Sequence, residues 1–328
     1  MVDPFDPAAT LTCWVLARPD DPGLRLLDPP PPGVRFVVGH DADAFTPADA
    51  PEVLLDCWAG PQLLAKAVAM APRLRWLHSR SAGLDRVLVP EVVAHPAVVT
   101  NGSGPFSAAL AEFVAAALLF FAKDLRRLID DQRAAAWRPF DMRMLAGQAL
   151  GVVGYGDIGR AVAARLRPFG MKVLALRRRP RRSAEDPLVD ELVPPERLLE
   201  LMARSDAVVV AAPLTPETRG MVGAAAIAAM RPTSVLVNVG RGPVVDEPAL
   251  VRALQEQRIR GAALDVFEHE PLPEGHPFWR MENVLVSPHC ADHVPGWLDP
   301  AMRLFLDNLE RFRRGEPLLN VVDKQRGY

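Results

Sequence analysis

The first hundred or so residues alternate short apolar runs with stretches of helical periodicity. A short apolar run bounded by turn-forming residues is typical of a buried strand. Regular alternation of strands and helices indicates a parallel sheet with helices on both faces. We therefore predict a small α/β domain, with strands at residues 11–17, 34–38, 52–57, 74–78 and 98–100.

A long and almost wholly apolar stretch follows at residues 107–127, with Glu112 as the single acid in its middle. Its length is close to that of a membrane span, but Glu112 and Lys123 argue against one. A helix that is apolar on most sides is instead buried between domains or subunits. We predict such a helix here and expect no membrane partner.

The alternation of strands and helices resumes at residue 150. The pattern predicts one doubly wound parallel sheet. A final helix at 297–314 comes after this sheet is complete, and we expect it to return to the N-terminal domain. The predicted strands are 150–153, 172–176, 207–211, 234–239, 261–266 and 284–286, and later helices are 195–204, 224–230 and 247–255.

The first turn of this second region reads G-x-G-x-x-G, with glycines at Gly154, Gly156 and Gly159. These glycines allow a tight turn, close approach of a pyrophosphate, and close packing of the helix on the strand. The phosphates would meet the amides at the helix N-terminus. The motif alone also occurs in ordinary loops and in methyltransferases, but the complete strand–helix–strand unit favours a dinucleotide. The residues between the glycines, which we also expect at the cofactor, are Tyr155, Asp157 and Ile158.

The second strand of this unit runs into a cluster of arginines that begins at Arg177 and Arg178. NAD-binding units usually place an acid here, where it binds the ribose hydroxyls. A guanidinium group instead binds a 2′-phosphate through charge-assisted hydrogen bonds. We therefore expect NADP as the preferred cofactor, with NAD possible. A solvated basic loop or a nucleic-acid patch is the alternative interpretation of this run.

Length and composition narrow the class further. A chain of 328 residues is long enough for about two domains with substantial cores. The formal net charge of -2 gives no reason to expect a nucleic acid as partner. The cysteines, Cys13, Cys57 and Cys290, lack paired metal-binding spacing. They suit a reducing compartment, and the N-terminus shows no secretory signal, so we expect a cytoplasmic protein without a metal.

Three polar residues follow late strands of the predicted sheet: Arg241, Glu270 and His289. Doubly wound sheets bind their ligands at the carboxyl ends of the strands. Taken singly, each residue is more often structural or solvated. Together, behind a dinucleotide-binding unit, they are what the reduction of a 2-keto acid needs. The set supplies a cation for the carboxylate, a proton donor for the ketone, and a carboxylate that keeps the donor charged.

Several motifs make the chain resemble the D-2-hydroxyacid dehydrogenase family from about residue 70 onward. Within the family it is similar to the glyoxylate and hydroxypyruvate reductases, which share arginines after the second strand and a Trp at the position of Trp137. The motifs are SAGLD at residues 81–85, AEF at 111–113, GYGDIG at 154–159, PLTPET at 213–218, NVGRG at 238–242, GAALDVF at 261–267 and SPH at 287–289.

The resemblance implies roles for the residues that reach the substrate. His289 would be the general acid in reduction, Glu270 its charge partner, and Arg241 the residue that binds the carboxylate and the ketone oxygen. In the family, backbone amides at the positions of Ala82 and Gly83 also bind the carboxylate. The product would then be a D-2-hydroxy acid.

The resemblance also implies further cofactor-binding positions. Asp265 corresponds to a residue that faces the nicotinamide, and Val239 to a carbonyl group near it. Pro213 and Thr218 match positions that line the adenosine and its ribose.

Two side chains leave alternatives open. Arg80 precedes the carboxylate-binding loop, where relatives that reduce small keto acids often carry an apolar residue. If it faces the substrate, it favours a keto acid with a second acidic group; if it faces outward, it is solvated. Trp137 either anchors a core or a dimer interface or, as the resemblance implies, reaches the neighbour's substrate site. We expect a twofold homodimer built on the helix at 107–127.

We therefore expect two Rossmann-like or flavodoxin-like doubly wound domains. A cofactor domain at residues 106–294 is inserted into a discontinuous substrate domain at 1–105 and 295–328. The expected activity is NAD(P)H-dependent reduction of a small 2-keto acid such as glyoxylate or hydroxypyruvate. An NAD-linked D-2-hydroxyacid dehydrogenase for another substrate stays open, and so does a non-catalytic, dinucleotide-sensing protein of the corepressor type.

Overall fold

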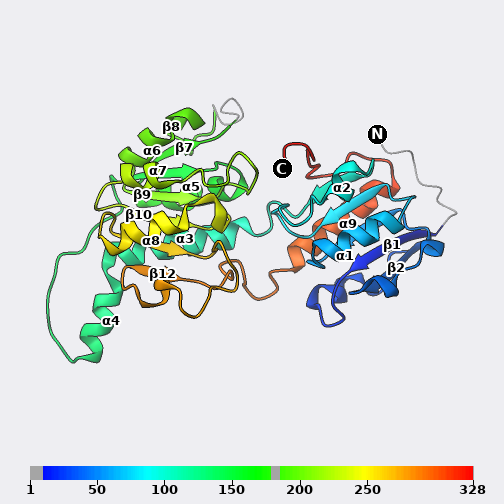
Figure 1. The fold of residues 1–328 in the computed structure, drawn as a ribbon, viewed down its shortest axis with the longest axis horizontal. Coiled ribbons are helices and arrows are strands. Elements are labelled where there is room, and N and C mark those ends of the chain that lie inside the picture. The colour runs from blue at the N-terminus through cyan, green and yellow to red at the C-terminus, as the bar shows by residue number, and fades with distance from the viewer. Residues whose placement is uncertain (1–9, 179–184, 328) are drawn as a thin grey trace. The chain divides into compact units, whose positions relative to one another are not determined.

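A computed structural model describes residues 10–178 and 185–327 (Figure 1). The chain divides into two compact units. The N-terminal unit runs to Phe106 and resumes at Val294, and the second unit is Ser107–His293. Each unit contains one parallel sheet. The predicted fold class, two doubly wound α/β domains with one inserted in the other, is confirmed.

The sheet of the N-terminal unit has the strand order β2-β1-β3-β4-β5, and each of its neighbouring pairs is parallel. The strands are nearly completely buried, except for the edge strand β2, because helices cover both faces. The elements are β1 (Leu11–Leu16), β2 (Val34–Gly39), β3 (Val53–Asp56), α1 (Pro61–Met70), β4 (Trp76–Ser79), α2 (Pro90–Ala94), β5 (Val98–Asn101) and α9 (Asp299–Arg313).

The last helix, α9, belongs to this first sheet although it comes from the end of the chain. Figure 1 shows it in orange among the blue and cyan elements of the unit. Its buried Phe305 and Phe312 stack on Trp76 of β4, with ring centroids 5.4 and 5.6 Å apart. The prediction that the final helix returns to the N-terminal domain is therefore confirmed.

The sheet of the second unit has the order β12-β11-β10-β9-β6-β7-β8, again with parallel pairs throughout. Among the strands of this sheet, the sequence pattern missed β8, a short edge strand. The elements are α3 (Ser107–Lys123), α4 (Leu125–Arg133), β6 (Ala149–Val153), α5 (Asp157–Leu166), β7 (Lys172–Leu176), β8 (Glu191–Val193), α6 (Leu198–Arg204), β9 (Ala207–Val210), α7 (Ala224–Ala229), β10 (Val235–Asn238), α8 (Glu247–Gln255), β11 (Gly261–Leu264) and β12 (Val284–Val286).

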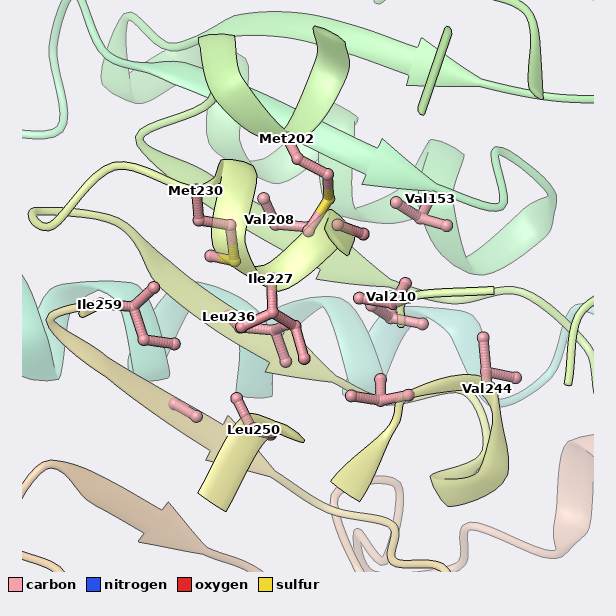
Figure 2. Packing of buried hydrophobic residues seen from close by; sticks show 14 of the residues in the cluster. Val153, Met202, Val208, Val210, Ile227, Met230, Leu236, Val244, Leu250 and Ile259 are labelled. Atoms are coloured by element: carbon pink, nitrogen blue, oxygen red, sulfur yellow. The ribbon is translucent and has the colours of Figure 1, made fainter. Parts of the chain in front are cut away.

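The core of this unit lies between the sheet and the helices that follow its strands. Figure 2 shows Met202 of α6 and Ile227 of α7 packed over Val208 and Leu236 of the central strands. These four side chains are at most 3% exposed. Burial of this kind stabilises the sheet by about 25 cal/mol for each Å² of apolar surface removed from water. A rigid sheet is the platform on which the loops at its carboxyl edge are held.

The predicted helix at 107–127 is wrong in one respect, because it is two helices. Asp124 adopts a left-handed conformation, with φ 49°, and ends α3 before α4 begins. The apolar face of α3 packs within its own unit, mainly against α5. In Figure 1, α4 and the segment after it extend away from the sheet of this unit. No helix in the described ranges is long and apolar enough to cross a membrane.

Both sheets have a point at which the strand order reverses. In the N-terminal unit this point lies between β1 and β3, and in the second unit between β6 and β9. Loops diverge to opposite faces there and leave room for a ligand outside the carboxyl ends of the strands. In each unit, this edge is where the polar loops described below begin.

Candidate active site

The glycine loop leaves the carboxyl end of β6, beside the reversal point. Gly154 has a φ of 94°, and a Cβ atom there would lie 2.5 Å from the backbone nitrogen of Ala212. A Cβ atom on Gly159 would lie 2.8 Å from the carbonyl oxygen of Gly154. Only glycine fits at these two positions, so the turn and the close packing of α5 are as the motif predicts. Around the Cβ position of Gly156, nothing lies within 4 Å.

The N-terminus of α5 has amides that can bind an anion. Gly156 is its N-cap and offers no side-chain acceptor. Within the described ranges, the amides of Asp157 and Ile158 donate to no acceptor. Such amides at a helix N-terminus carry a partial positive charge and bind phosphate groups. The loop therefore fits the pyrophosphate of a dinucleotide.

Arg177 and Arg178 follow β7 and lie near the glycine loop, expected at the pyrophosphate, and the loop after β9, expected at the adenosine. Burial, and next the charge of Asp186, raise the pKa of the Tyr155 hydroxyl in the glycine loop, while the charge of Arg177 opposes the rise. The pKa of Glu217 is lowered first by a hydrogen bond from Thr215, with a smaller contribution from the charge of Arg178. The later arginines of the run, up to residue 182, lie outside the described residues.

Thr218, Pro213 and Val239 lie on loops after β9 and β10. The Thr218 hydroxyl donates to the carbonyl oxygen of Pro213 at 2.6 Å and accepts from the amide of Thr215 at 2.8 Å. The hydroxyl therefore holds its own turn together. Val239 is buried, and its amide donates to the carbonyl oxygen of Val210 at 3.0 Å. That these residues contact a cofactor stays a prediction.

The three residues expected to act on the substrate come together in the second unit. Nδ1 of His289 lies 2.8 Å from Oε2 of Glu270. Oε1 of Glu270 accepts a hydrogen bond from the amide of Phe267 at 3.0 Å, which fixes the carboxylate. Arg241 is near enough for its charge to affect the pKa of both partners. Because an ionised carboxylate only accepts hydrogen bonds, Nδ1 must donate, and Nε2 is the nitrogen left for a substrate.

The pair favours a charged imidazole. The hydrogen bond to Glu270 raises the pKa of His289, and this effect exceeds the lowering by burial. Burial raises the pKa of Glu270, but the hydrogen bonds from His289 and the Phe267 amide, with the charges of His289 and Arg241, together lower it. Both groups therefore stay ionised over a wider pH range than either would alone. A protonated His289 can give its Nε2 proton to an oxygen atom.

Asp265 has a role that the sequence interpretation missed. Its side chain is 1% exposed, and its Oδ1 accepts from the Ser287 hydroxyl at 2.6 Å and from the amides of Cys290 and Ala291 at 2.9 and 3.1 Å. These bonds hold the turn in which His289 has a φ of 52°. The available signal was register: Leu264 pairs with Val286, so Asp265 and Ser287 are the next residues on adjacent strands. That Asp265 lies at the nicotinamide stays a prediction.

The N-terminal unit carries the loop expected to bind the carboxylate. Asn101, at the end of β5, donates from Nδ2 to the carbonyl oxygen of Ala82 at 2.8 Å. The amides of Ala82 and Gly83 donate to no acceptor among the residues that the structure describes. Two adjacent amides that have no acceptor of their own can donate to an anion. This is the arrangement that binding of a carboxylate by the backbone requires.

Arg80 is not solvated, so that interpretation is wrong. Its side chain is 1% exposed, and its two terminal nitrogens donate to Asp21 at 2.8 and 2.7 Å. The Asp21 carboxylate therefore neutralises the positive charge of Arg80, which a second acidic group of a substrate would need as its partner. The sequence could not reveal Asp21 as the partner, because the two residues are 59 positions apart.

Comparison with known proteins identifies the family. The model of the D-isomer specific 2-hydroxyacid dehydrogenase, NAD binding domain, matches residues 115–291. A glyoxylate reductase from Korarchaeum cryptofilum (strain OPF8) is 38% identical over 290 residues, which cover 84% of this chain and 85% of that protein. The chain belongs to the D-isomer specific 2-hydroxyacid dehydrogenase family. A glyoxylate reductase from Thermococcus gammatolerans is 38% identical over 267 residues, 78% of each chain.

Solved structures of family members extend the similarity to the whole chain. A D-isomer specific 2-hydroxyacid dehydrogenase from Xanthobacter autotrophicus Py2, in complex with NADPH and MES, superposes with a TM-score of 0.84 at 33% identity. The match covers 98% of this chain and 100% of that one. An NADPH-dependent glyoxylate/hydroxypyruvate reductase from Sinorhizobium meliloti has a TM-score of 0.84 at 26% identity over 97% of this chain and 100% of its own. This chain is therefore a nicotinamide-dependent oxidoreductase that reduces a keto acid to a hydroxy acid.

Two glycine variants should separate the structural from the binding role of the glycine loop. Gly154→Ala forces a side chain into left-handed backbone against Ala212, so the free energy of unfolding should fall by about 2 kcal/mol or more. Gly156→Ala meets no neighbour, so stability should change by less than about 0.5 kcal/mol. Its methyl group would obstruct the pyrophosphate and weaken cofactor binding about tenfold or more.

Denaturant unfolding and titration with NADPH measure the two quantities. Equal loss of stability in both variants, or unchanged affinity in Gly156→Ala, would contradict this account of the loop.

Proposed function

We propose that this chain reduces glyoxylate, hydroxypyruvate or a similarly small 2-keto acid to the D-2-hydroxy acid, with NADPH as the preferred reductant. The observation that carries the proposal is the 2.8 Å hydrogen bond between His289 and Glu270, with Arg241 close by, in the unit that has the dinucleotide-type glycine loop. The choice of substrate is supported by the glyoxylate reductases and the glyoxylate/hydroxypyruvate reductase to which the chain is similar.

Reduction adds a hydride to the keto carbon and a proton to the keto oxygen. When bound, the reduced nicotinamide supplies the hydride. His289 supplies the proton from Nε2, because Nδ1 is held by Glu270. Glu270 keeps the imidazole charged before transfer and orients the ring. Loss of the proton leaves a neutral imidazole, which solvent protonates again before the next turnover.

The substrate carboxylate needs cations or free amides. We assign it to the guanidinium group of Arg241 and to the amides of Ala82 and Gly83, which have no acceptor in the described part of the chain. Arg80 is left out of this assignment because Asp21 already occupies its guanidinium group.

Initial rates with a panel of keto acids test the proposal. With NADPH, glyoxylate and hydroxypyruvate should be reduced faster than pyruvate or oxaloacetate. His289→Ala should lower kcat by about a hundredfold or more, because the proton donor is lost. His276→Ala is the matched control, because His276 also pairs with a glutamate, Glu247, at 3.3 Å but is not assigned to the site. No turnover with either cofactor, although both bind, would favour the sensing protein; a different keto acid with NADH would favour the NAD-linked dehydrogenase.

NADPH preference is supported by the side chains that follow β7. Arg177 and Arg178 lie beside the glycine loop and the loop after β9, and neither position offers a carboxylate to the ribose. Two similar solved structures contain NADPH or NADP. A guanidinium group forms charge-assisted hydrogen bonds with a 2′-phosphate. Its interaction with a 2′-hydroxyl is much weaker.

Arginine variants should change cofactor preference in one direction. Arg177→Gln and Arg178→Gln, singly and combined, should raise KM for NADPH about tenfold or more while KM for NADH changes little, because only the 2′-phosphate contact is lost. Arg258→Gln, on an exposed side chain after α8, is the control. Equal increases for both cofactors would show that the arginines do not read the 2′-phosphate.

We also infer a twofold homodimer. The exposed apolar side chains of the second unit gather on α4 and the segment after it, rather than on α3. Trp137 is 95% exposed and Met144 69%, and Leu128 and Ile129 of α4 are partly exposed. Apolar side chains concentrated in this way mark a surface that another chain covers.

The cytoplasmic location of the protein stays a prediction.

Charge placed on this surface should separate the dimer. Sedimentation velocity at micromolar protein should give a dimer for the wild type and a monomer for Leu128→Asp combined with Ile129→Asp, since a buried unpaired charge is costly. Leu199→Asp, at an exposed leucine on α6, should stay dimeric. A monomeric wild type would contradict the proposed dimer. If Trp137 reaches the neighbour's site, Trp137→Ala should raise KM for the keto acid within an intact dimer.

A further inference from the structure

The ion pair between Arg80 and Asp21 is too buried to be explained by surface electrostatics. The two side chains are 1% and 11% exposed, and both oxygens of Asp21 accept from the guanidinium group. Nε of Arg80 is buried and has no acceptor within the described ranges. Removing two charges from water costs as much as or more than their attraction returns, so a buried pair is weak evidence for stability. The position of the Arg80–Asp21 pair in the fold explains its presence better than a contribution to stability does.

The pair connects loops at the carboxyl edge of the first sheet. Asp21 follows β1 and Trp58 follows β3, on the two sides of the point where the strand order reverses. Arg80 follows β4, and Gly102 follows β5. A Cβ atom on Gly102 would lie 2.1 Å from the carbonyl oxygen of Arg80, so these two loops are in direct contact. Arg80 therefore lies where four strands end.

The carboxylate-binding loop begins with the residue after Arg80. The Arg80 guanidinium group packs over the ring of Trp58, 4.9 Å from its centroid. Nε1 of Trp58 donates in turn to the hydroxyl of Ser81. The backbone of Trp58 has a φ of 65°, which is strained for a bulky residue and persists only where surrounding contacts impose it. The carbonyl oxygen of Ser81 accepts from the amide of Gly102 at 2.9 Å.

We propose that Arg80 is a positioning residue for the substrate carboxylate: paired with Asp21 and packed on Trp58, it fixes the loop whose Ala82 and Gly83 amides bind that group. This inference rests on the proposed function of those amides. It replaces the idea that Arg80 contacts a second acidic group of the substrate. A planar fork that binds both oxygens of Asp21 and stacks on a ring cannot be replaced by lysine.

The chain contains a matched control at the other end of the same strand. Arg75 precedes β4, donates to Glu52 at 2.9 Å and lies over the ring of Phe312, 5.0 Å from its centroid. Arg80 and Arg75 therefore share a carboxylate partner and an aromatic neighbour. Only Arg80 is next to the carboxylate-binding loop.

The experiment compares Arg80→Lys with Arg75→Lys in the full-length protein. Arg80→Lys should raise KM for glyoxylate about tenfold, with KM for NADPH and the ratio of oxaloacetate to glyoxylate turnover unchanged. Arg75→Lys should leave all three values at the wild-type level. Hydrogen–deuterium exchange without substrate should be faster in the segment 79–86 of Arg80→Lys alone. This second readout does not depend on turnover.

Four results would overturn the inference: wild-type KM and exchange in Arg80→Lys, equal increases in KM in both lysine variants, an increase in the KM for NADPH as large as that for glyoxylate, or a selective loss of oxaloacetate turnover. The last would mean that Arg80 contacts the substrate. A wild type that reduces no keto acid would instead refute the proposed function, and the exchange measurement would still test the positioning role. Asp21→Asn provides a second variant, in which the same segment should exchange faster.

Discussion

Parallel pairing of the strands is the constraint on which the rest of this structure depends. Every strand pair described in the two sheets is parallel, so each loop that follows a strand lies at one edge of its sheet. A parallel sheet also needs helices on both faces, and these helices account for the alternating sequence pattern. Residues far apart in the chain, such as Arg241 and His289, are close together for this reason. The reversal of strand order then determines where along that edge a ligand has room.

The chemistry depends on one hydrogen bond at that edge. Glu270 raises the pKa of His289 and fixes which nitrogen carries the transferable proton. Asp265 holds the turn that places His289 in a left-handed conformation, and it does so with a buried carboxylate oxygen that accepts three hydrogen bonds. In the N-terminal unit, Asn101 and the pair of Arg80 with Asp21 hold a loop in a comparable way. His289 and the loop of Ala82 and Gly83 are thus each held by polar groups on neighbouring loops.

The sequence predicted those features that depend on local pattern. Apolar runs and glycine spacing predicted both sheets, the glycine loop and the three residues His289, Glu270 and Arg241, because each follows a strand. The sequence could not predict contacts between distant loops, such as the contact of Asp21 with Arg80, because nothing local distinguishes a paired arginine from a solvated one. The break between α3 and α4 was missed because Asp124 is compatible with a helix and only tertiary packing selects its left-handed backbone. β8 was missed because an edge strand of three residues carries little apolar pattern.

The pH dependence of reduction tests the central claim most directly. If protonated His289 is the donor, kcat/KM for the keto acid is constant at low pH and falls as the pH rises through the pKa of His289. Because Glu270 raises that pKa above the ordinary value of about 6.5, the fall should begin above it in the wild type. In Glu270→Gln the raised pKa is lost, so the fall should shift to lower pH and the plateau should decrease. Identical profiles for the two proteins, with the fall at the same pH, would contradict the account.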